Sequence, residues 1–318
     1  MILLIGGGGF IGHNLAVELK RSGREVIIVD PLIVNNKYVL TDLRLQTIVA
    51  QREALLEYWK IPLITADARD YHLLSHIAGY YRPSAIVHLA AISHIDRANK
   101  DPFSTFDHNL RSLENSLDAA KAVRCGKFVF FSSSTVYGNF KKPVIDETEP
   151  CEPKGIYGSL KLAGELMVRA YGEVYGLPWA VIRPMAAYGS RCVSGRVTQK
   201  FIELAAEGKP LKIEGDGESR VDFTHVDDII QGVVGTIDCG VSGIFNITAG
   251  ESRSLKELAG IVQGHFPGVG LEYGPADPQR PLRGTLSIAK ARSVLGYAPK
   301  WRLEEGMADY IRWYRDVG

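Results

Sequence analysis

Tyr157 and Lys161 carry complementary acid–base chemistry and lie four positions apart in the sequence. In a helix this spacing places a phenol and an ammonium group on the same face. A free tyrosine has a pKa of about 10, so a phenol that acts as a base near neutral pH needs a pKa about three units lower, or about 4 kcal/mol. A neighbouring ammonium group favours the phenolate, so the pair predicts a tyrosine base for proton transfer.

A second pair with the same spacing, Tyr137 and Lys141, is a weaker candidate because helix-breaking residues follow it. Gly138 and Pro143 interrupt any helix that starts at this tyrosine. The first pair instead begins a pattern of apolar residues every three or four positions, which predicts a long helix over residues 157–176.

A hydroxyl group at the end of a predicted strand is the third participant. Residues 131–138 read Phe-Ser-Ser-Ser-Thr-Val-Tyr-Gly and follow the apolar run at 127–131. A serine there can share a hydrogen bond with Tyr157 and with the reacting hydroxyl group of a substrate. An ordinary polar turn is the alternative, since Ser and Gly also favour turns.

Three glycines, Gly6, Gly9 and Gly12, follow the apolar run at 2–5 and open a helical pattern over 10–22. Glycines let the backbone turn tightly and approach a pyrophosphate, and the amino end of the helix supplies free N–H groups and a partial positive charge. A plain strand-to-helix turn is the alternative. The position of the motif favours a dinucleotide, whose oxidised nicotinamide ring would further favour the phenolate at position 157.

Two aspartates mark where the adenosine half of such a cofactor would lie. Asp30 ends the second predicted strand, where a carboxylate accepts hydrogen bonds from the ribose hydroxyl groups. It would repel a 2′-phosphate and Pro31 offers no compensating charge, so the sequence favours NAD over NADP. Asp67, after the third predicted strand, could receive the adenine amino group or could cap the helix that follows.

Short apolar runs alternate with helical patterns through the first half of the chain. We predict strands at residues 2–5, 25–29, 62–65, 85–89, 127–131 and 180–182. This alternation predicts an α/β fold with a doubly wound, Rossmann-like parallel sheet. Glycine and proline become denser from about residue 185, which suggests a smaller C-terminal domain over the carboxyl edge of the sheet, where such folds bind ligands.

We therefore assign residues 1–184, with a later segment at about 222–248, to a nucleotide-binding domain, and residues 185–318 mainly to a substrate-binding domain. A second long helix is predicted over residues 99–123 from its apolar spacing. One face of each long helix must pack within the molecule. A second apolar face on both helices predicts a homodimer, since closed twofold dimers are the commonest oligomers.

Composition excludes several classes of protein. The 318 residues are 46% hydrophobic and 23% charged, unlike disordered or fibrous chains. A net charge of +1 provides no field for binding nucleic acid, and no apolar stretch reaches the about 20 residues that span a membrane. Met1 runs directly into an apolar strand without a basic leader, so no signal peptide is expected. Four scattered cysteines and eight histidines form no metal pattern, and we expect a cytoplasmic protein without a metal.

As a set, these residues resemble the extended short-chain dehydrogenase/reductases of the nucleotide-sugar epimerase/dehydratase group. The resemblance covers nearly the whole chain. Besides the residues above it rests on His88-Leu89-Ala90-Ala91, Asn109, Arg183-Pro184, Gly215-Asp216-Gly217, Asp222-Phe223, Val226-Asp227-Asp228 and residues 290–299.

The resemblance implies a role for each residue of the site. Tyr157 would be the catalytic base, Lys161 would hold the nicotinamide ribose and tune Tyr157, and Ser133 would assist. The substrate, a nucleoside diphosphate sugar, would contact Ser133, Ser134, Arg220 and Arg280. The cofactor NAD would contact Gly6, Gly9, Phe10, Ile11, Gly12, Asp30, Asp67, Ala68, Leu89, Ala90, Ala91, Asn109, Tyr157, Lys161 and Pro184.

Four positions depart from the pattern of this family. Ser134 and Thr135 stand where sugar 4,6-dehydratases carry Asp-Glu, and related decarboxylases usually place Glu at the second of these positions. Ala186 replaces an asparagine that helps to seat the diphosphate, and Val221 replaces an arginine, which is displaced to position 220. We expect an altered diphosphate grip, in which Arg220, Arg280 or Arg283 meets a phosphate.

These observations together predict an NAD-dependent nucleotide-sugar epimerase that acts at C4. Tyr157 would take the proton of the sugar hydroxyl while hydride passes to NAD, and the hydride would return to the other face of the keto sugar. One alternative is a reductase, dehydrogenase or decarboxylase of the same fold. Another is a cofactor-binding scaffold without chemistry.

Overall fold

A parallel sheet of seven strands forms the centre of the computed structural model, which describes residues 1–33, 38, 40–93, 95–193, 195–277 and 280–317. Its order is β12-β7-β5-β4-β1-β2-β3. The strands are β1 (Ile2–Ile5), β2 (Val26–Val29), β3 (Leu63–Ile64), β4 (Ala85–His88), β5 (Lys127–Phe131), β7 (Trp179–Arg183) and β12 (Gly243–Asn246). All six predicted strands are present, which confirms the doubly wound α/β fold, and β12 adds a seventh.

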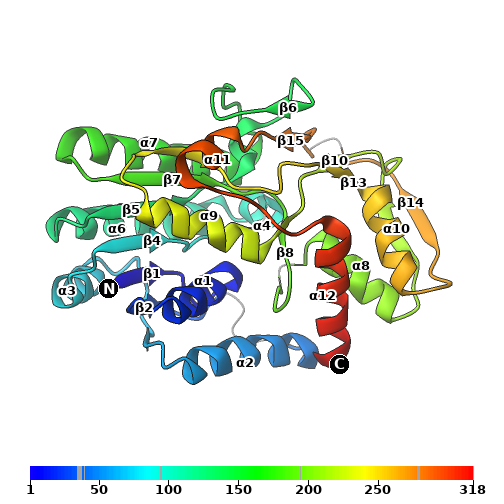
Figure 1. Cartoon of the computed structure of the whole chain (residues 1–318), viewed down its shortest axis with the longest axis horizontal. Coiled ribbons are helices and arrows are strands. Elements are labelled where there is room, and N and C mark those ends of the chain that lie inside the picture. The colour runs from blue at the N-terminus through cyan, green and yellow to red at the C-terminus, as the bar shows by residue number, and fades with distance from the viewer. Residues whose placement is uncertain (34–37, 39, 94, 194, 278–279, 318) are drawn as a thin grey trace.

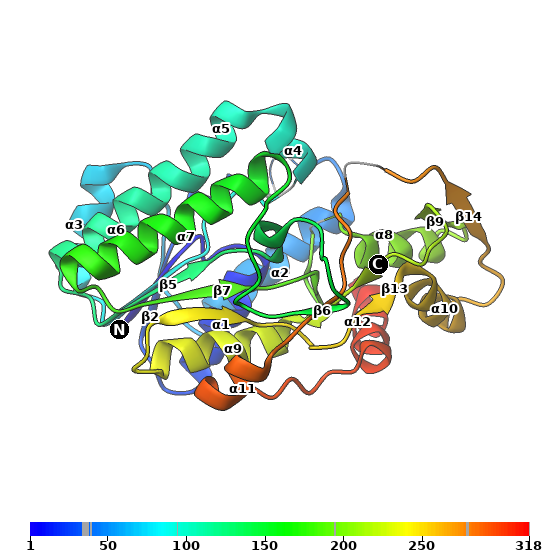
Figure 2. The same cartoon turned by 90° about the horizontal axis from the view of Figure 1, so that it is seen from above.

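Helices cover both faces of this sheet (Figures 1 and 2). Leu4 and Ile28 belong to one buried core with α1 (Phe10–Arg21), α9 (Val226–Asp238) and α11 (Ala289–Leu295). Leu3 and Ile27 belong to another with α3 (Tyr71–Tyr81), α6 (Ser112–Ala122) and α7 (Gly155–Tyr175). Neighbouring residues of a strand point to opposite faces of the sheet. Because helices cover both faces, every position of a central strand is buried, which explains the continuous apolar runs.

The helix predicted over 99–123 is observed as one continuous helical run over residues 102–122, with a π-helical turn inside it and a separate short helix before it. The separate helix is α4 (Ile95–Lys100), and the run consists of α5 (Pro102–Phe106), the π-helical turn (Asp107–Arg111) and α6. Pro102 cannot donate a backbone N–H, and the Asp101 side chain accepts from the Ser104 N–H at 3.0 Å, so a new helix starts here. The helix predicted over 157–176 is observed as α7.

The residues after 184 contribute most of a third hydrophobic core, which lies beside the sheet in Figure 2. Phe201, Leu258 and Tyr310 are buried in it, and Phe10, directly after the glycines, packs against it. The elements in this part of the chain include β8 (Ala187–Tyr188), α8 (Val197–Ala206), β9 (Leu211–Glu214), β10 (Arg220–Val221), β11 (Thr224–His225), β13 (Arg253–Ser254), α10 (Leu255–His265), β14 (Leu271–Gly274) and α12 (Leu303–Val317).

Three further elements lie outside the central sheet. The helix α2 (Leu43–Tyr58) packs against α1 and α12, while β6 (Val144–Ile145) pairs with β15 (Thr285–Leu286). Because the strands of the sheet are parallel, their carboxyl ends meet at one edge. The strand order changes direction between β1 and β4, and that point is where doubly wound sheets bind ligands.

Candidate active site

Tyr157 and Lys161 lie in the first turns of α7, and both side chains are buried, with 7% and 4% exposure. The Lys161 Nζ donates to the carbonyl oxygen of Phe131 at 2.5 Å and lies 5.9 Å from the centroid of the Tyr157 ring. Phe131 is the last residue of β5. The pair is therefore held against the carboxyl end of a central strand.

Ser133 follows β5 and lies beside this pair. Its hydroxyl oxygen accepts from the Thr135 N–H at 3.2 Å, which starts a 3-10 turn over Ser134–Tyr137. Its hydroxyl group is also close enough to the Tyr157 phenol to lower the pKa of that phenol. The structure thus brings together the three residues that the sequence suggested for chemistry.

The sequence predicted that Lys161 lowers the pKa of the Tyr157 phenol, but in the structure this pKa is raised. Burial raises the pKa of Tyr157, and the charge of Arg196 and the bond to Ser133 lower it. Burial lowers the pKa of Lys161 to about 7, and Glu165 opposes that shift. Arg196 was not predicted as a site residue, because it precedes α8 and lies 39 positions from Tyr157, so no local spacing indicates it.

A buried ion pair lies one helical turn beyond Lys161. Glu165 Oε2 accepts from Arg183 Nη2 at 2.6 Å, Oε1 accepts from Arg183 Nε at 2.9 Å, and the hydroxyl group of Ser132 donates to Oε1. Ser132 precedes Ser133 and Arg183 ends β7, so one carboxylate joins β5, α7 and β7 at the site. Glu165 was not predicted as a site residue, although its i+4 spacing from Lys161 continues the same helix face.

The glycine loop lies against the backbone that follows β4. Gly6 has φ +79°, and a Cβ atom there would lie 2.5 Å from the Ala90 backbone nitrogen. The N–H groups of Leu89 and Ala90 donate to the Ile5 carbonyl oxygen at 2.8 and 3.0 Å. No side chain caps the amino end of α1 at Gly9. An uncapped helix start in a cradle that a Cβ would fill fits a pyrophosphate, which Phe10, Ile11 and Gly12 of the first turn would help to hold.

Asp30 is fixed at the end of β2 by backbone donors. Its Oδ2 accepts from the Gly8 N–H at 2.9 Å, and Oδ1 accepts from the Leu32 N–H at 2.8 Å. Burial raises the pKa of this carboxyl group, and the nearby charge of Arg52 opposes the shift. The carboxylate therefore lies beside the glycine loop, where its role toward the cofactor ribose remains a prediction.

Asp67 does not cap the helix that follows it. The cap of α3 is Asp70, whose side chain accepts from the Leu73 N–H at 3.0 Å. Asp67 instead pairs with Arg69 at 2.6 Å, which holds the pKa of its carboxyl group below the usual value. The capping alternative is wrong, and a contact with adenine stays a prediction.

Three other predicted cofactor residues have structural partners. Asn109 accepts from the Ile92 N–H at 2.7 Å and donates to the Ile92 carbonyl oxygen at 3.2 Å, which fixes the segment after Ala91. The carbonyl oxygen of Ala68 accepts from Asn115 at 2.9 Å. The carbonyl oxygen of Pro184 accepts from the Ser134 N–H at 3.0 Å.

The arginines suggested for the substrate have different surroundings. Arg220 lies 3.6 Å from Glu257, and Arg280 lies 3.0 Å from Glu214. Arg283 instead donates to the carbonyl oxygen of Ser134 at 2.9 Å. Of these three, Arg283 is the one that contacts the segment after β5.

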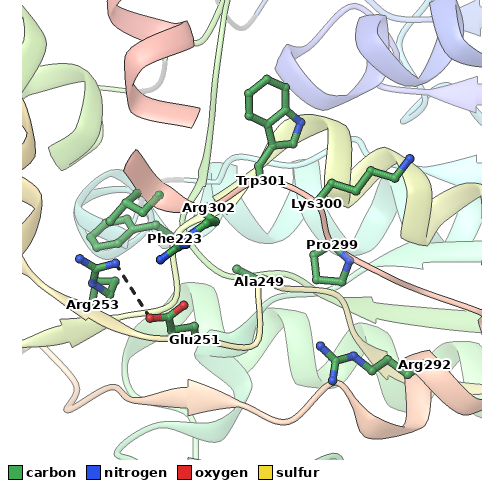
Figure 3. Close-up of a pocket in the computed structure, with 10 residues that line it drawn as sticks. Phe223, Ala249, Glu251, Arg253, Arg292, Pro299, Lys300, Trp301 and Arg302 are labelled. Carbon is green, nitrogen blue, oxygen red and sulfur yellow. Dashed lines mark ion pairs between the residues drawn. The ribbon is translucent and has the colours of Figure 1, made fainter. Parts of the chain in front are cut away.

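A pocket of about 170 Å³ lies apart from these residues, at the start of α12 (Figure 3). The Arg253 side chain is turned toward Glu251 there, and their charged groups are 3.9 Å apart. The residues that line the pocket are Phe223, Ala249, Glu251, Arg253, Arg292, Pro299, Lys300, Trp301, Arg302 and Leu303. None of the residues predicted for the site lines this pocket.

The fold and the site define a Rossmann-type nucleotide-binding protein with a buried tyrosine–lysine pair. The chain belongs to the NAD dependent epimerase/dehydratase family, whose model matches residues 2–248. The comparison confirms the resemblance drawn from the sequence, and with it the NAD cofactor. Within the described residues, no group of three or more His, Cys, Asp and Glu is placed to hold a metal.

Relatives of known description cover the whole chain. A dTDP-glucose 4,6-dehydratase of Streptomyces niveus is 28% identical over 99% of this chain and 93% of its own length. A UDP-glucuronate 4-epimerase of Thermodesulfobacterium geofontis is 27% identical over 99% and 96%. A solved UDP-glucuronic acid 4-epimerase of Bacillus cereus, in complex with UDP-glucuronic acid and NAD, has a TM-score of 0.90 at 26% identity, covering 100% of this chain and 99% of the other.

Proposed function

We propose that this protein is an NAD-dependent 4-epimerase of a UDP-sugar. The observation that carries the proposal is the placement of the Tyr157 phenol, the Ser133 hydroxyl group and the Lys161 side chain around the carboxyl end of β5. The relatives that are UDP-sugar 4-epimerases support it. A dehydratase is disfavoured because Ser134 and Thr135 stand where acid and base would be needed.

Each residue has a distinct task in this reaction. Tyr157 takes the proton from the C4 hydroxyl group and returns it after inversion, and Ser133 shares a hydrogen bond with the phenol and that hydroxyl group. Lys161 holds the nicotinamide ribose. NAD⁺, held by the glycine loop and Lys161, would supply both the hydride acceptor and the hydride donor for C4, so the reaction would have no net oxidation.

The test is a search for inversion at C4. The NAD-loaded protein is incubated with UDP-glucose, UDP-glucuronate and UDP-N-acetylglucosamine, and the products are identified by proton NMR. We expect inversion of at least one sugar, and we expect Tyr157→Phe to abolish it while NAD stays bound. Tyr80→Phe, a change in an exposed tyrosine of α3, is the control and keeps full activity. Full activity of Tyr157→Phe would refute the assignment.

We also propose a homodimer and a reducing compartment. Exposed apolar side chains of α5 and α7 support the dimer, and Figure 2 shows both helices on the same side of the molecule. The exposed apolar side chains are Phe103, Phe106, Leu166, Val174 and Tyr175. Cys125, Cys151 and Cys239 form no disulfide bond in the described part of the chain, which supports a reducing compartment such as the cytoplasm. No helix in the described part of the chain is long and apolar enough to cross a membrane.

A further inference from the structure

Arg283 is a half-buried cation beside the segment that carries Ser133. Its Nη1 donates to the carbonyl oxygen of Ser134 at 2.9 Å and lies 3.5 Å from that of Gly138. Its guanidinium carbon lies 5.8 Å from the centroid of the Phe140 ring. Neutral oxygens and an aromatic ring hold this side chain in place, and no described residue supplies a counter-ion for its positive charge.

No carboxylate pairs with Arg283 among the residues that the structure describes. Arg220 and Arg280, by contrast, each have an acidic partner. Burial lowers the pKa of Arg283 to about 10. Because a desolvated cation without a counter-ion is unfavourable, this position favours an anionic group from a ligand.

The remaining donors of Arg283 can be reached by such a ligand. Nε and Nη2 make no hydrogen bond within the described part of the chain, and neither is sealed from solvent. A guanidinium group presents its N–H groups as a planar fork, which fits a carboxylate or a phosphate through two parallel bonds.

The place of Ser134 in the chain favours one of these anions. The Ser133 hydroxyl group lies close enough to the Tyr157 phenol to lower its pKa, so under the proposed function it faces C4 of the sugar. Ser134, which holds Arg283, is the next residue, about 3.8 Å further along the backbone. In a hexose the C6 group is attached to C5, directly beside C4, whereas the diphosphate is attached to C1 at the opposite end of the ring.

We propose that Arg283 binds a carboxylate at C6 of the sugar, so that the substrate is a nucleoside diphosphate uronic acid. The inference rests on the proposed 4-epimerase function and names its substrate class. A neutral hydroxymethyl group at C6 leaves the guanidinium group without its counter-ion, so neutral sugars bind less tightly.

Calorimetric titration of the NAD-loaded protein with UDP-glucuronate, UDP-glucose and UDP tests this assignment. We expect the wild-type protein to bind UDP-glucuronate about tenfold more tightly than UDP-glucose. Arg283→Met should weaken UDP-glucuronate about 30-fold and UDP less than about threefold. Arg292→Met, a change in an exposed arginine of α11, is the matched control and should alter none of the three affinities.

Several outcomes overturn the inference. Equal loss of affinity for UDP and UDP-glucuronate in Arg283→Met assigns the arginine to the diphosphate, and unchanged affinity for all three ligands removes it from the substrate site. Arg283→Lys, which keeps the charge without the fork, carries the test if the Met variant fails to fold, and it should lose about fivefold for UDP-glucuronate alone. Failure of the wild-type protein to bind any UDP compound would refute the proposed function itself.

Discussion

At the scale of single residues, Glu165 affects the charge of Lys161. Burial lowers the pKa of Lys161 to about 7, and Glu165 opposes that shift. The ammonium form is therefore lost as the pH rises through about 7, and a rate that needs this form falls over the same range. His88 is buried near Lys161. Burial and the charge of Lys161 lower the pKa of His88 to about 3, so its imidazole is neutral over this pH range.

Replacing Glu165 with Gln removes the negative charge that raises the pKa of Lys161. We expect the alkaline fall in kcat to move about one pH unit lower. The pH profile of kcat measures this, and Glu173→Gln, a change in an exposed carboxylate of the same helix, should leave the profile in place. An unaltered alkaline limb in Glu165→Gln would show that the two side chains are not coupled.

Burial also decides what an ion pair contributes to stability. The pair of Arg183 and Glu165 is 3% and 2% exposed, whereas the pair of Arg24 and Asp238, at 2.7 Å, is 31% and 52% exposed. Arg183→Met leaves a buried carboxylate without its partner, so we expect it to lower the free energy of unfolding by about 3–5 kcal/mol. Arg24→Met should cost less than about 1 kcal/mol. Urea unfolding measures both, and equal losses would contradict the expectation.

At the scale of elements, the glycine loop is shaped by its contact with the segment after β4. Gly6 and Gly23 both have φ +79°, but a Cβ atom meets the Ala90 backbone at 2.5 Å in the first and nothing within 4 Å in the second. Gly23→Ala should therefore show the backbone cost alone, about 1–2 kcal/mol. Gly6→Ala should lose more stability and should also lose NAD binding.

Thermal unfolding and calorimetric titration with NAD compare these two alanine variants directly. If Gly6→Ala binds NAD as tightly as Gly23→Ala does, the cradle between β1 and β4 is not the pyrophosphate site.

At the scale of the whole molecule, the exposed apolar side chains of α5 and α7 predict how two copies associate. Leu166 on α7 is 55% exposed, and Leu43 on α2 is 76% exposed. Leu166→Glu places a charge within the proposed interface, so we expect a monomer, whereas Leu43→Glu should leave the dimer intact. Light scattering after size-exclusion chromatography measures the mass, and a dimer that persists in Leu166→Glu would refute this interface.

The sequence and the structure agree where short-range patterns determine the outcome. Alternating apolar runs predicted the sheet, and the i, i+4 spacing placed Tyr157 and Lys161 on one helix face. The helix predicted over 99–123 is present over residues 102–122 but begins three residues later than predicted, because apolar periodicity does not register the break at Asp101 and Pro102. The role of Asp67 as a cap was wrong because a better-placed acid, Asp70, follows three residues later.

The sequence by itself determined the fold class, the glycine loop and the tyrosine–lysine pair, because each depends on residues a few positions apart. Tertiary structure alone decided which partners the buried charged groups meet. Arg183 and Glu165 are 18 positions apart, and Arg283 and Ser134 are 149 apart. With 37 basic and 36 acidic residues, no spacing in the chain selects such partners. Their choice follows from the packing of distant elements at one edge of the sheet, where burial strengthens a paired charge and makes an unpaired one costly.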